Sequence, residues 1–341
     1  MRSAVLALLF AAVGAGQDAP PEPGTDEFAS PPAEPPVPKR DAGIGRPGNF
    51  GMGGSPGYLA SWYPTRPVAG SGLDLGIVRQ SLSGGYPVWK DEGNTLLTTA
   101  GLRYTRFDTD AVLPDTGRPF PADLWDLNAG LMYIRKFENG WTGAAFVRGG
   151  SASDRPFHSF DELYASAGGF LTVPAANDRD SWLFAFFYSS AGSLNFPVPG
   201  LAYVWNPTPE WRVTLGIPFA VQWRPTEDWT VDLSYLPLTN INARATYRVG
   251  ERWSVFAGYE FQSEAYFLAD RLHVRDRFFV LEQRIVGGAR WNLSERWSLD
   301  FQGGYAFERD FGEGDGQNDL TRDRLSVAAG AFAGLNLRFG F

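Results

Sequence analysis

The 341-residue sequence lacks several residue types on which common functional sites depend. It contains no cysteine and only two histidines. The absence of cysteine excludes disulfides, zinc–thiolate sites, a thiol nucleophile and a lipid anchor attached to cysteine. The net charge of −8 provides no basic surplus and argues against nucleic acid as a partner.

Long hydrophobic runs are also missing beyond the N-terminus. No later stretch approaches the roughly 20 apolar residues that a membrane-spanning helix needs, and the mean hydropathy is only −0.22. Aromatic residues and glycine are instead frequent, with 12 Trp, 26 Phe and 40 Gly. This combination is typical of strands that have one apolar face and one polar face.

The N-terminus has the pattern of a secretory signal peptide. Arg2 precedes an apolar segment from Ala4 to Val13, and the small residues Gly14 and Gly16 stand before a cleavage position. We therefore predict that residues 1–16 form a cleaved signal peptide and that the protein is exported.

Residues 17–69 are predicted to form a linker. Proline, glycine and acidic residues dominate much of this stretch, which cannot bury enough apolar surface to offset the entropy of ordering. We interpret it as a disordered or extended spacer before a domain at residues 70–341, although a role in binding a periplasmic partner stays open.

A repeat headed by tryptophan organises that domain. Six times, a short turn rich in Glu, Asp, Asn, Gly or Pro precedes a tryptophan and an alternating segment, as tight strand connections do. Tryptophan at one end of successive strands predicts an aromatic girdle at a membrane interface. The six girdle candidates are Trp141, Trp182, Trp211, Trp229, Trp253 and Trp297.

Apolar and polar residues alternate with period 2 in several long segments, which indicates strands. From Leu325 to Phe341, the odd-numbered residues are expected to share one face of a single strand. After Trp297, Asp300 and Glu308 are expected to share the polar face.

These features together predict an all-β fold, a closed antiparallel transmembrane β-barrel. The strands reach the length that crosses a membrane, and an open sheet edge would leave backbone groups unpaired in lipid. We expect about 14 strands, within a range of 12 to 16, with short turns on the periplasmic side. Residues 73–82 are either a further strand or an element inside the lumen.

The C-terminus resembles the terminal signature of Gram-negative outer-membrane barrels. Phe341 ends the chain, and Phe339, Leu337 and Leu335 precede it on the same expected face. The resemblance implies that Phe341 is an assembly signal read by the barrel-assembly machinery. It also implies that the protein resides in outer-membrane lipid.

A second resemblance is carried by the segment PVPGLAYVWNPTPEWRVTLGIPFAVQWRPTEDWTVDLSYLPLTN. Its Gly-Leu-x-Tyr start, its LGIP segment and its LPLTN apex are similar to an uncharacterised, porin-like family of Gram-negative outer-membrane barrels. That family is known only as a domain of unknown function. The resemblance extends over residues 70–341 and implies no activity.

The two histidines offer little for catalysis. His158 is followed by Ser159, but neighbours on a strand point to opposite faces, and Phe160 occupies the third position of the His-x-Ser pattern of lipid A deacylases. His273 has no serine nearby in the sequence. We predict neither enzymatic activity nor a cofactor, with a lipid-acting enzyme as the least favoured reading.

One acidic segment, residues 312–319, has oxygen-bearing side chains that suit Ca²⁺. It contains Glu313, Asp315 and Asp319 but lacks the spacing of an EF-hand loop. We expect a solvated loop rather than a metal site.

The predicted inner face suggests the function. Rings of arginine favour anions, so a passive channel for small solutes is the first hypothesis. Arginine–carboxylate pairs that fill the lumen would instead make a non-conducting structural or docking barrel. Apolar lumen positions (Phe146, Phe170 and Phe332) suggest passage of hydrophobic solutes. The candidate lumen-lining residues are Arg212, Arg224, Asp232, Arg244, Arg248, Glu282, Arg284, Arg290, Asp300 and Arg338.

Overall fold

The computed structural model describes residues 56–341, except for residues 178, 193–195, 237–239, 318–319 and 341. The predicted signal peptide, most of the predicted linker and Phe341 therefore lie outside the described residues. Within the described part, seventeen strands form one sheet and a 3₁₀ turn occupies Phe160–Glu162. No helix of this part is long and apolar enough to cross a membrane.

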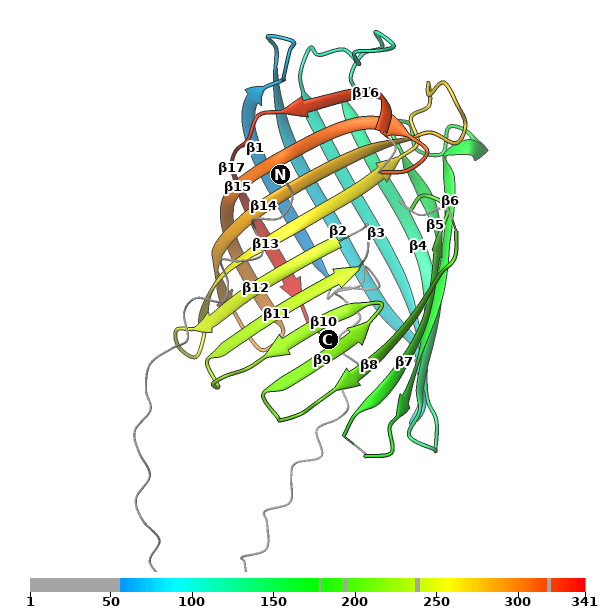
Figure 1. Cartoon of the computed structure of the whole chain (residues 1–341), viewed down its shortest axis with the longest axis vertical. Helices are drawn as coiled ribbons and strands as arrows, with labels where there is room; N and C mark the ends of the chain where they lie inside the picture. Colours follow the sequence, from blue (N-terminus) through cyan, green and yellow to red (C-terminus); the bar gives the residue numbers. More distant parts are fainter. Residues whose placement is uncertain (1–55, 178, 193–195, 237–239, 318–319, 341) are drawn as a thin grey trace, which may run out of the picture. The chain divides into compact units, whose positions relative to one another are not determined.

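The strands vary widely in length (Figure 1). They are β1 (Gly57–Pro67), β2 (Asp74–Lys90), β3 (Asn94–Asp108), β4 (Asp123–Lys136), β5 (Thr142–Ser153), β6 (Leu163–Pro174), β7 (Ser181–Ser189), β8 (Val198–Trp205), β9 (Trp211–Gly216), β10 (Phe219–Trp223), β11 (Trp229–Leu236), β12 (Asn240–Arg248), β13 (Trp253–Tyr266), β14 (Arg277–Asn292), β15 (Trp297–Gly314), β16 (Leu320–Val327) and β17 (Gly330–Phe339).

The sheet closes into an antiparallel barrel. Strands β1 to β15 pair in sequence order, β15 pairs with β17, and β17 returns to β1. Sixteen strands complete this circuit, with β16 as an additional strand, so the predicted closed barrel is confirmed at the upper limit of its size range. Of residues 73–82, all but Leu73 belong to the wall strand β2, so this segment is a further strand and not an element inside the lumen.

The barrel begins earlier than predicted. Strand β1 starts at Gly57, so the predicted end of the linker at residue 69 is wrong. It pairs from Gly57 opposite Arg338 to Trp62 opposite Ala333, and it supplies the closing edge for β17. The proline- and glycine-rich composition of the surrounding stretch hid this single alternating segment.

The C-terminal segment is not one uninterrupted strand. β15 pairs with β17 over its first half and with β16 over its second half. The continuous chain leaves strand conformation at residues 328–329, between β16 and β17. Leu325 and Val327 are buried, whereas Ala331 and Ala333 are exposed on the other side of the break. The expectation that odd-numbered residues share one face is therefore wrong.

A second irregularity lies at Glu308 in β15. Its φ of 46° and the register shift in the pairing with β14 mark a β-bulge. A bulge adds one residue, so it exchanges the two faces of the strand. Asp300 is buried before the bulge and Arg309 after it, while Glu308 is exposed rather than sharing the face of Asp300.

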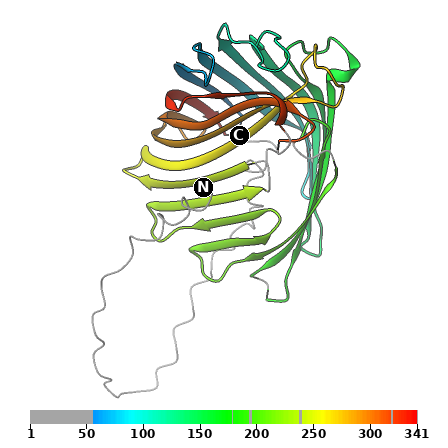
Figure 2. The ribbon, with the colours of Figure 1, turned by 45° about the horizontal axis from the view of Figure 1, so that its top comes forward.

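The upper ends of β13–β16 bend across one mouth of the barrel (Figure 2). Just beyond β13, the Phe267 amide donates to the Ala152 carbonyl at 2.7 Å, and Phe267 forms a parallel bridge with Ser153 at the end of β5. A buried apolar cluster fills the space beneath, with T-shaped contacts of 5.1–5.7 Å among four rings. These rings belong to Phe107, Phe120, Phe278 and Phe311.

The opposite mouth carries the tryptophans. The six girdle candidates all lie at this end, at the short turns, and all are partly exposed. Cross-strand ring pairs join Trp211 to Trp223 at 5.2 Å and Trp253 to Trp291 at 5.5 Å. We call this the tryptophan end.

The closing seam between β1 and β17 is open to a direct test because the chain has no cysteine. Ala60 and Leu335 lie directly opposite each other, at a Cα separation that a disulfide spans. We expect Ala60→Cys with Leu335→Cys to oxidise nearly completely in the folded protein, as measured by non-reducing gel shift and mass spectrometry.

The matched control is Ala60→Cys with Leu337→Cys. Leu337 pairs with Tyr58, so its Cβ lies on a diagonal about 7 Å from residue 60 or farther. This pair should stay reduced. If the control pair crosslinks as readily as the seam pair, the register of the closed barrel is wrong.

Candidate functional site: the lumen

Most of the predicted lumen residues lie on inner faces of the wall. Arg212, Asp232, Arg244, Glu282, Arg284, Arg290, Asp300 and Arg338 occupy strands β9, β11, β12, β14, β15 and β17. Arg224 follows β10 and is exposed, and Arg248 ends β12, where it pairs with Asp228 at 3.1 Å. These two arginines lie at the rim at the tryptophan end rather than along the wall.

Access to the arginine-lined side of the lumen decreases from the tryptophan end. The exposed fraction of the side chain falls from 31% at Arg338 to 18% at Arg244 and 1% at Arg309, whereas Arg103 on β3, across the lumen, is 41% exposed. The lumen is therefore open at the tryptophan end and narrowed by the side chains of β13–β16 toward the other mouth.

The accessible end of the lumen carries excess positive charge. Arg290 donates to both oxygens of Asp300 at 2.7 and 3.0 Å, and Arg338 donates to the same carboxylate at 2.6 Å. The Asp300 side chain is fully buried beneath them. One carboxylate thus holds two guanidinium groups at the open end of the lumen.

A second layer of ion pairs lies deeper. Glu260 on β13 accepts from Arg244 at 3.0 Å and from Arg284 Nε at 2.7 Å. Arg284 in turn donates to the Tyr63 hydroxyl at 3.0 Å, which connects β14 to β1.

Glu282 is the centre of the deepest layer. Its carboxylate accepts from the Tyr63 hydroxyl at 2.8 Å and from Arg79 at 3.2 Å, and it lies 3.3 Å from Arg309 Nε. The side chains of Glu282 and Arg309 are almost fully buried. An unpaired charge at this depth would be costly, so Glu282 and the groups around it are held together as one unit.

One ion pair bridges strands that are far apart around the barrel. Arg103 on β3 lies 3.1 Å from Glu264 on β13, although β14, β15, β17, β1 and β2 separate these strands in the sheet. Strand β13 also contacts β4 and β5 directly. The closed half is therefore held together through the lumen as well as along the wall.

The connection between β3 and β4 caps the closed mouth. Arg118 donates to Asp270, Glu313 and Asp323 at 3.0, 2.6 and 3.1 Å. Burial alone would lower the pKa of the Arg118 guanidinium, but its bonds to Glu313 and Asp323 outweigh that effect and raise the pKa. The cap therefore stays charged and paired.

The acidic segment at 312–319 is largely absorbed by these pairs. Glu313 is buried against Arg118, and Asp315 pairs with Arg277 at 3.4 Å. Asp319 lies outside the described residues. Across the part of the chain that the structure describes, no group of three or more His, Cys, Asp or Glu side chains is arranged to hold a metal ion.

Both histidines lie in exposed connections at the closed end. His158 Nδ1 is 3.7 Å from Glu162 Oε1, and its side chain is largely exposed. His273 lies between β13 and β14, where its carbonyl accepts from the Asp276 amide. Among the described hydrogen bonds, none joins a serine hydroxyl to either imidazole.

The inner face of β5–β7 is apolar in contrast to the arginine-lined side. Phe146 stacks on Phe187 at 6.2 Å across Gly168, where an added Cβ would come within 2.6 Å of the Phe146 ring. Phe170 lies on the same face. Phe332 is instead buried against Tyr63 at 5.2 Å and belongs to the closed core.

Phe187 was not singled out from the sequence. The sequence feature that could have identified Phe187 is the alternation after Trp182. This alternation places Phe187 on the face of β7 that does not carry Phe184 and Phe186.

Three other lumen residues were also missed. Tyr63 lies on β1, which was assigned to the linker, and Arg79 lies in the segment 73–82, whose role was left open. Arg309 faces inward only because of the bulge in β15.

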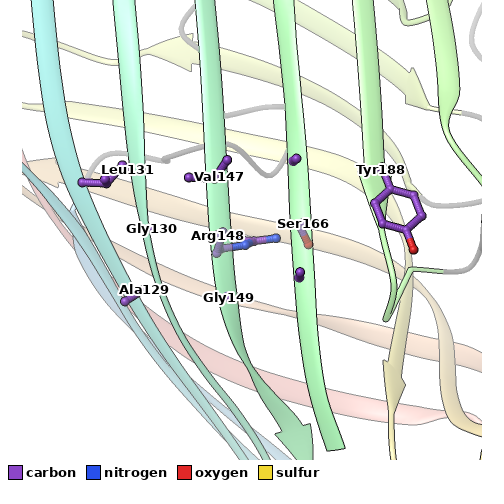
Figure 3. A pocket seen from close by; sticks show the side chains of 10 residues that line it. Ala129, Gly130, Leu131, Val147, Arg148, Gly149, Ser166 and Tyr188 are labelled. Atoms are coloured by element: carbon purple, nitrogen blue, oxygen red, sulfur yellow. The ribbon is translucent and has the colours of Figure 1, made fainter. Parts of the chain in front are cut away.

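A separate hollow lies on β4–β7 (Figure 3) and has a volume of about 460 Å³. Leu131, Val147 and Tyr188 line it together with small residues such as Ala129 and Gly149. These residues alternate with the inward-facing ones and include exposed apolar side chains. The hollow therefore belongs to the apolar outer face and not to the lumen.

Comparison with protein families matches residues 91–318 to the model described as Domain of unknown function (DUF6268). The match covers most of the chain. The protein belongs to this family. The expected membership of an uncharacterised family is thereby confirmed. Among curated proteins, none matches the sequence.

Solved structures with a similar arrangement include barrels of several kinds. The beta domain of the Bordetella autotransporter BrkA is 11% identical over 84% of this chain and 99% of that chain, with a TM-score of 0.33. An outer membrane channel from Pseudomonas putida F1 is 11% identical over 84% and 96%, with a TM-score of 0.33.

A mutant of the TodX monoaromatic hydrocarbon channel is 10% identical over 84% of this chain and 88% of that chain, with a TM-score of 0.33. Likeness at this level says nothing about the activity of the present chain.

The buried position of Glu282 gives a stability prediction. Glu282→Ala leaves Arg79 and Arg309 buried without their carboxylate, so we expect the free energy of unfolding to fall by about 3–5 kcal/mol. Urea titration of the protein refolded into lipid vesicles, followed by tryptophan fluorescence, measures the change.

The control removes an exposed pair instead. In Asp228→Asn the partner Arg248 is about half exposed, and the loss should stay below about 1 kcal/mol because solvent screens such pairs. Equal losses in the two variants would show that the deep layer contributes no more than a surface pair.

Proposed function

We propose that the protein is an exported outer-membrane barrel that passes small solutes passively through a narrow, arginine-lined part of its lumen. The observation that carries this proposal is the pair of inward guanidinium groups, Arg290 and Arg338, which share the Asp300 carboxylate and are 26% and 31% exposed at the open end of the lumen. Outer-membrane lipid and the barrel-assembly machinery, acting on the C-terminal strand, are the partners in this proposal.

The apolar outer face and the tryptophan end support the membrane location. Exposed apolar side chains recur at alternate positions of the wall, such as Trp182, Phe184 and Phe186 on β7. An outward apolar band bordered by aromatic rings is the pattern of barrels that lie in lipid. The short turns at the tryptophan end would then face the periplasm.

The closed end limits what kind of channel this is. The packed aromatic cluster and the Glu282 layer leave no wide aqueous path along the barrel axis, so the conductance should be small. The inward guanidinium groups at the open end should favour anions. The same packing is what favours the rival function, a non-conducting structural barrel.

Planar-bilayer recording of the refolded protein tests the channel. We expect small anion-selective currents, and Arg290→Glu with Arg338→Glu should shift the reversal potential toward cations because both charges face the accessible lumen. Arg155→Glu, in the exposed connection after β5, is the control and should leave selectivity unchanged.

A different result would favour the rival function. If the wild-type protein migrates as a folded, heat-modifiable barrel but neither it nor its arginine variants ever conduct, the protein is a non-conducting structural barrel.

A further inference from the structure

The barrel wall is far lower on one side than on the other. From the tryptophan end, β9 runs only from Trp211 to Gly216 and β10 only from Trp223 back to Phe219. Across the circuit of sixteen strands from them, β2 runs from Lys90 to Asp74, which is 17 residues. With a rise of about 3.3 Å per residue and a tilt of about 40°, β9 gains only about 13 Å of height, well below the apolar band of about 25 Å.

The neighbouring strands are also short. β8 and β11 have eight residues each and β12 has nine. Figure 1 shows β8–β12, in green to yellow-green, below β13–β16. We call these five strands the low wall.

The β9–β10 connection differs in chemistry from the long connections at the closed mouth. It consists of Ile217 and Pro218 and contains no charged residue, whereas the connections at 109–122, 154–162 and 267–276 each contain several. The nearest charged group at the neighbouring β7–β8 connection is Arg277 of β14, which donates to the Gly192 carbonyl.

The tip of the β9–β10 hairpin is suited to an apolar medium. Ile217 is 41% exposed, and Leu201 and Leu215 just below it are also exposed on the outer face. The Ile217 amide donates to the Leu201 carbonyl at 3.0 Å, and Pro218 has no amide hydrogen. The tip thus presents few unpaired donors, which is the condition for backbone in contact with lipid.

The geometry points to a lateral opening above the low wall, through which a small uncharged lipophilic molecule exchanges between the membrane interior and the lumen. The inner face beside it carries the Phe146–Phe187 stack and Phe170, which are only partly buried. This apolar surface lies next to the low wall on its β7 side, whereas the ion-paired layers begin on its other side, with Arg244 on β12 and Glu260 on β13. The inference deepens the proposed function, on which it rests, by naming a class of solute.

The depth of the hairpin tip is the first measurement. A single cysteine at Ile217→Cys carries an environment-sensitive fluorophore, and the full mature chain is refolded into phosphatidylcholine vesicles with brominated acyl chains. We expect strong quenching by the bromines at residue 217. At Arg155→Cys, in a charged connection, we expect little bromine quenching and strong quenching by aqueous iodide.

Iodide quenching at residue 217 as strong as at residue 155 would place the tip in water and overturn the lateral opening. This result does not depend on whether the barrel conducts ions, so it is separable from a failure of the proposed function.

The second measurement follows the route to the lumen. Phe187→Cys lies on the inner face beside the low wall, and Asn336→Cys lies on the inner face of β17, where the wall has full height. Each variant is labelled with pyrene maleimide dissolved in the bilayer and, separately, with a sulfonated maleimide in water. The ratio of the two rates should be at least about tenfold higher at residue 187, because an apolar reagent enters from the membrane at a favourable transfer free energy.

Equal ratios at the two positions would mean that both are reached only from the tryptophan end, and the opening would be wrong. Phe184→Cys, on the outer face of the same strand, reports the rate for a residue in direct contact with lipid. Heat-modifiable migration of each variant confirms that the barrel compared is folded.

Discussion

The structure depends on one constraint, the pairing of every strand edge within the wall. Strand β17 has to meet β1 because an unpaired edge in lipid would leave a row of backbone donors and acceptors without partners. Closure also determines where each side chain points, since residues alternate between an outer apolar face and an inner polar one. The arginines and carboxylates of β12–β17 face inward for this reason, and they form their ion pairs on the inner face.

A closed wall does not by itself make an open pore. In this barrel, two local irregularities in the strands narrow the lumen at one mouth. The bulge at Glu308 and the break at residues 328–329 let β15 and β16 bend inward while keeping their pairing. The bend brings Arg309 and Phe311 to the inner side, where Glu282, Tyr63 and Phe120 receive them. The closed mouth contains a set of buried charges, and among them Arg79, Arg284 and Arg309 each lie within about 3.3 Å of a carboxylate oxygen.

The sequence was sufficient for the elements that repeat. Trp211, Trp229 and Trp253 each follow a turn and begin a strand. The period-2 alternation then predicts which residues of each strand face inward and which face outward. It was insufficient wherever one residue breaks a pattern. The face of Arg309 depends on the bulge at Glu308, which alternation cannot reveal, and β1 stood alone in a stretch whose average composition resembles a linker. The pairing of Arg103 with Glu264 joins strands on different sides of the lumen, so no local signal predicts it.

The unequal height of the wall connects these features. Long strands on one side supply the residues that bend over and close the mouth, and short strands on the other side leave the wall low at β9 and β10. Narrowing the axial path and lowering one side are complementary, because a barrel that is packed toward one mouth passes little through that mouth and can exchange solute over the low part of its wall. The charge-free Ile217-Pro218 tip lies in this low part of the wall, and Arg277 at the end of β14 reaches the neighbouring β7–β8 connection at Gly192. The Phe146–Phe187 stack lies on the β7 side of the low wall, whereas Arg244 and Glu260 begin the ion-paired layers on its other side, so the inner surface changes from apolar to charged across the low wall.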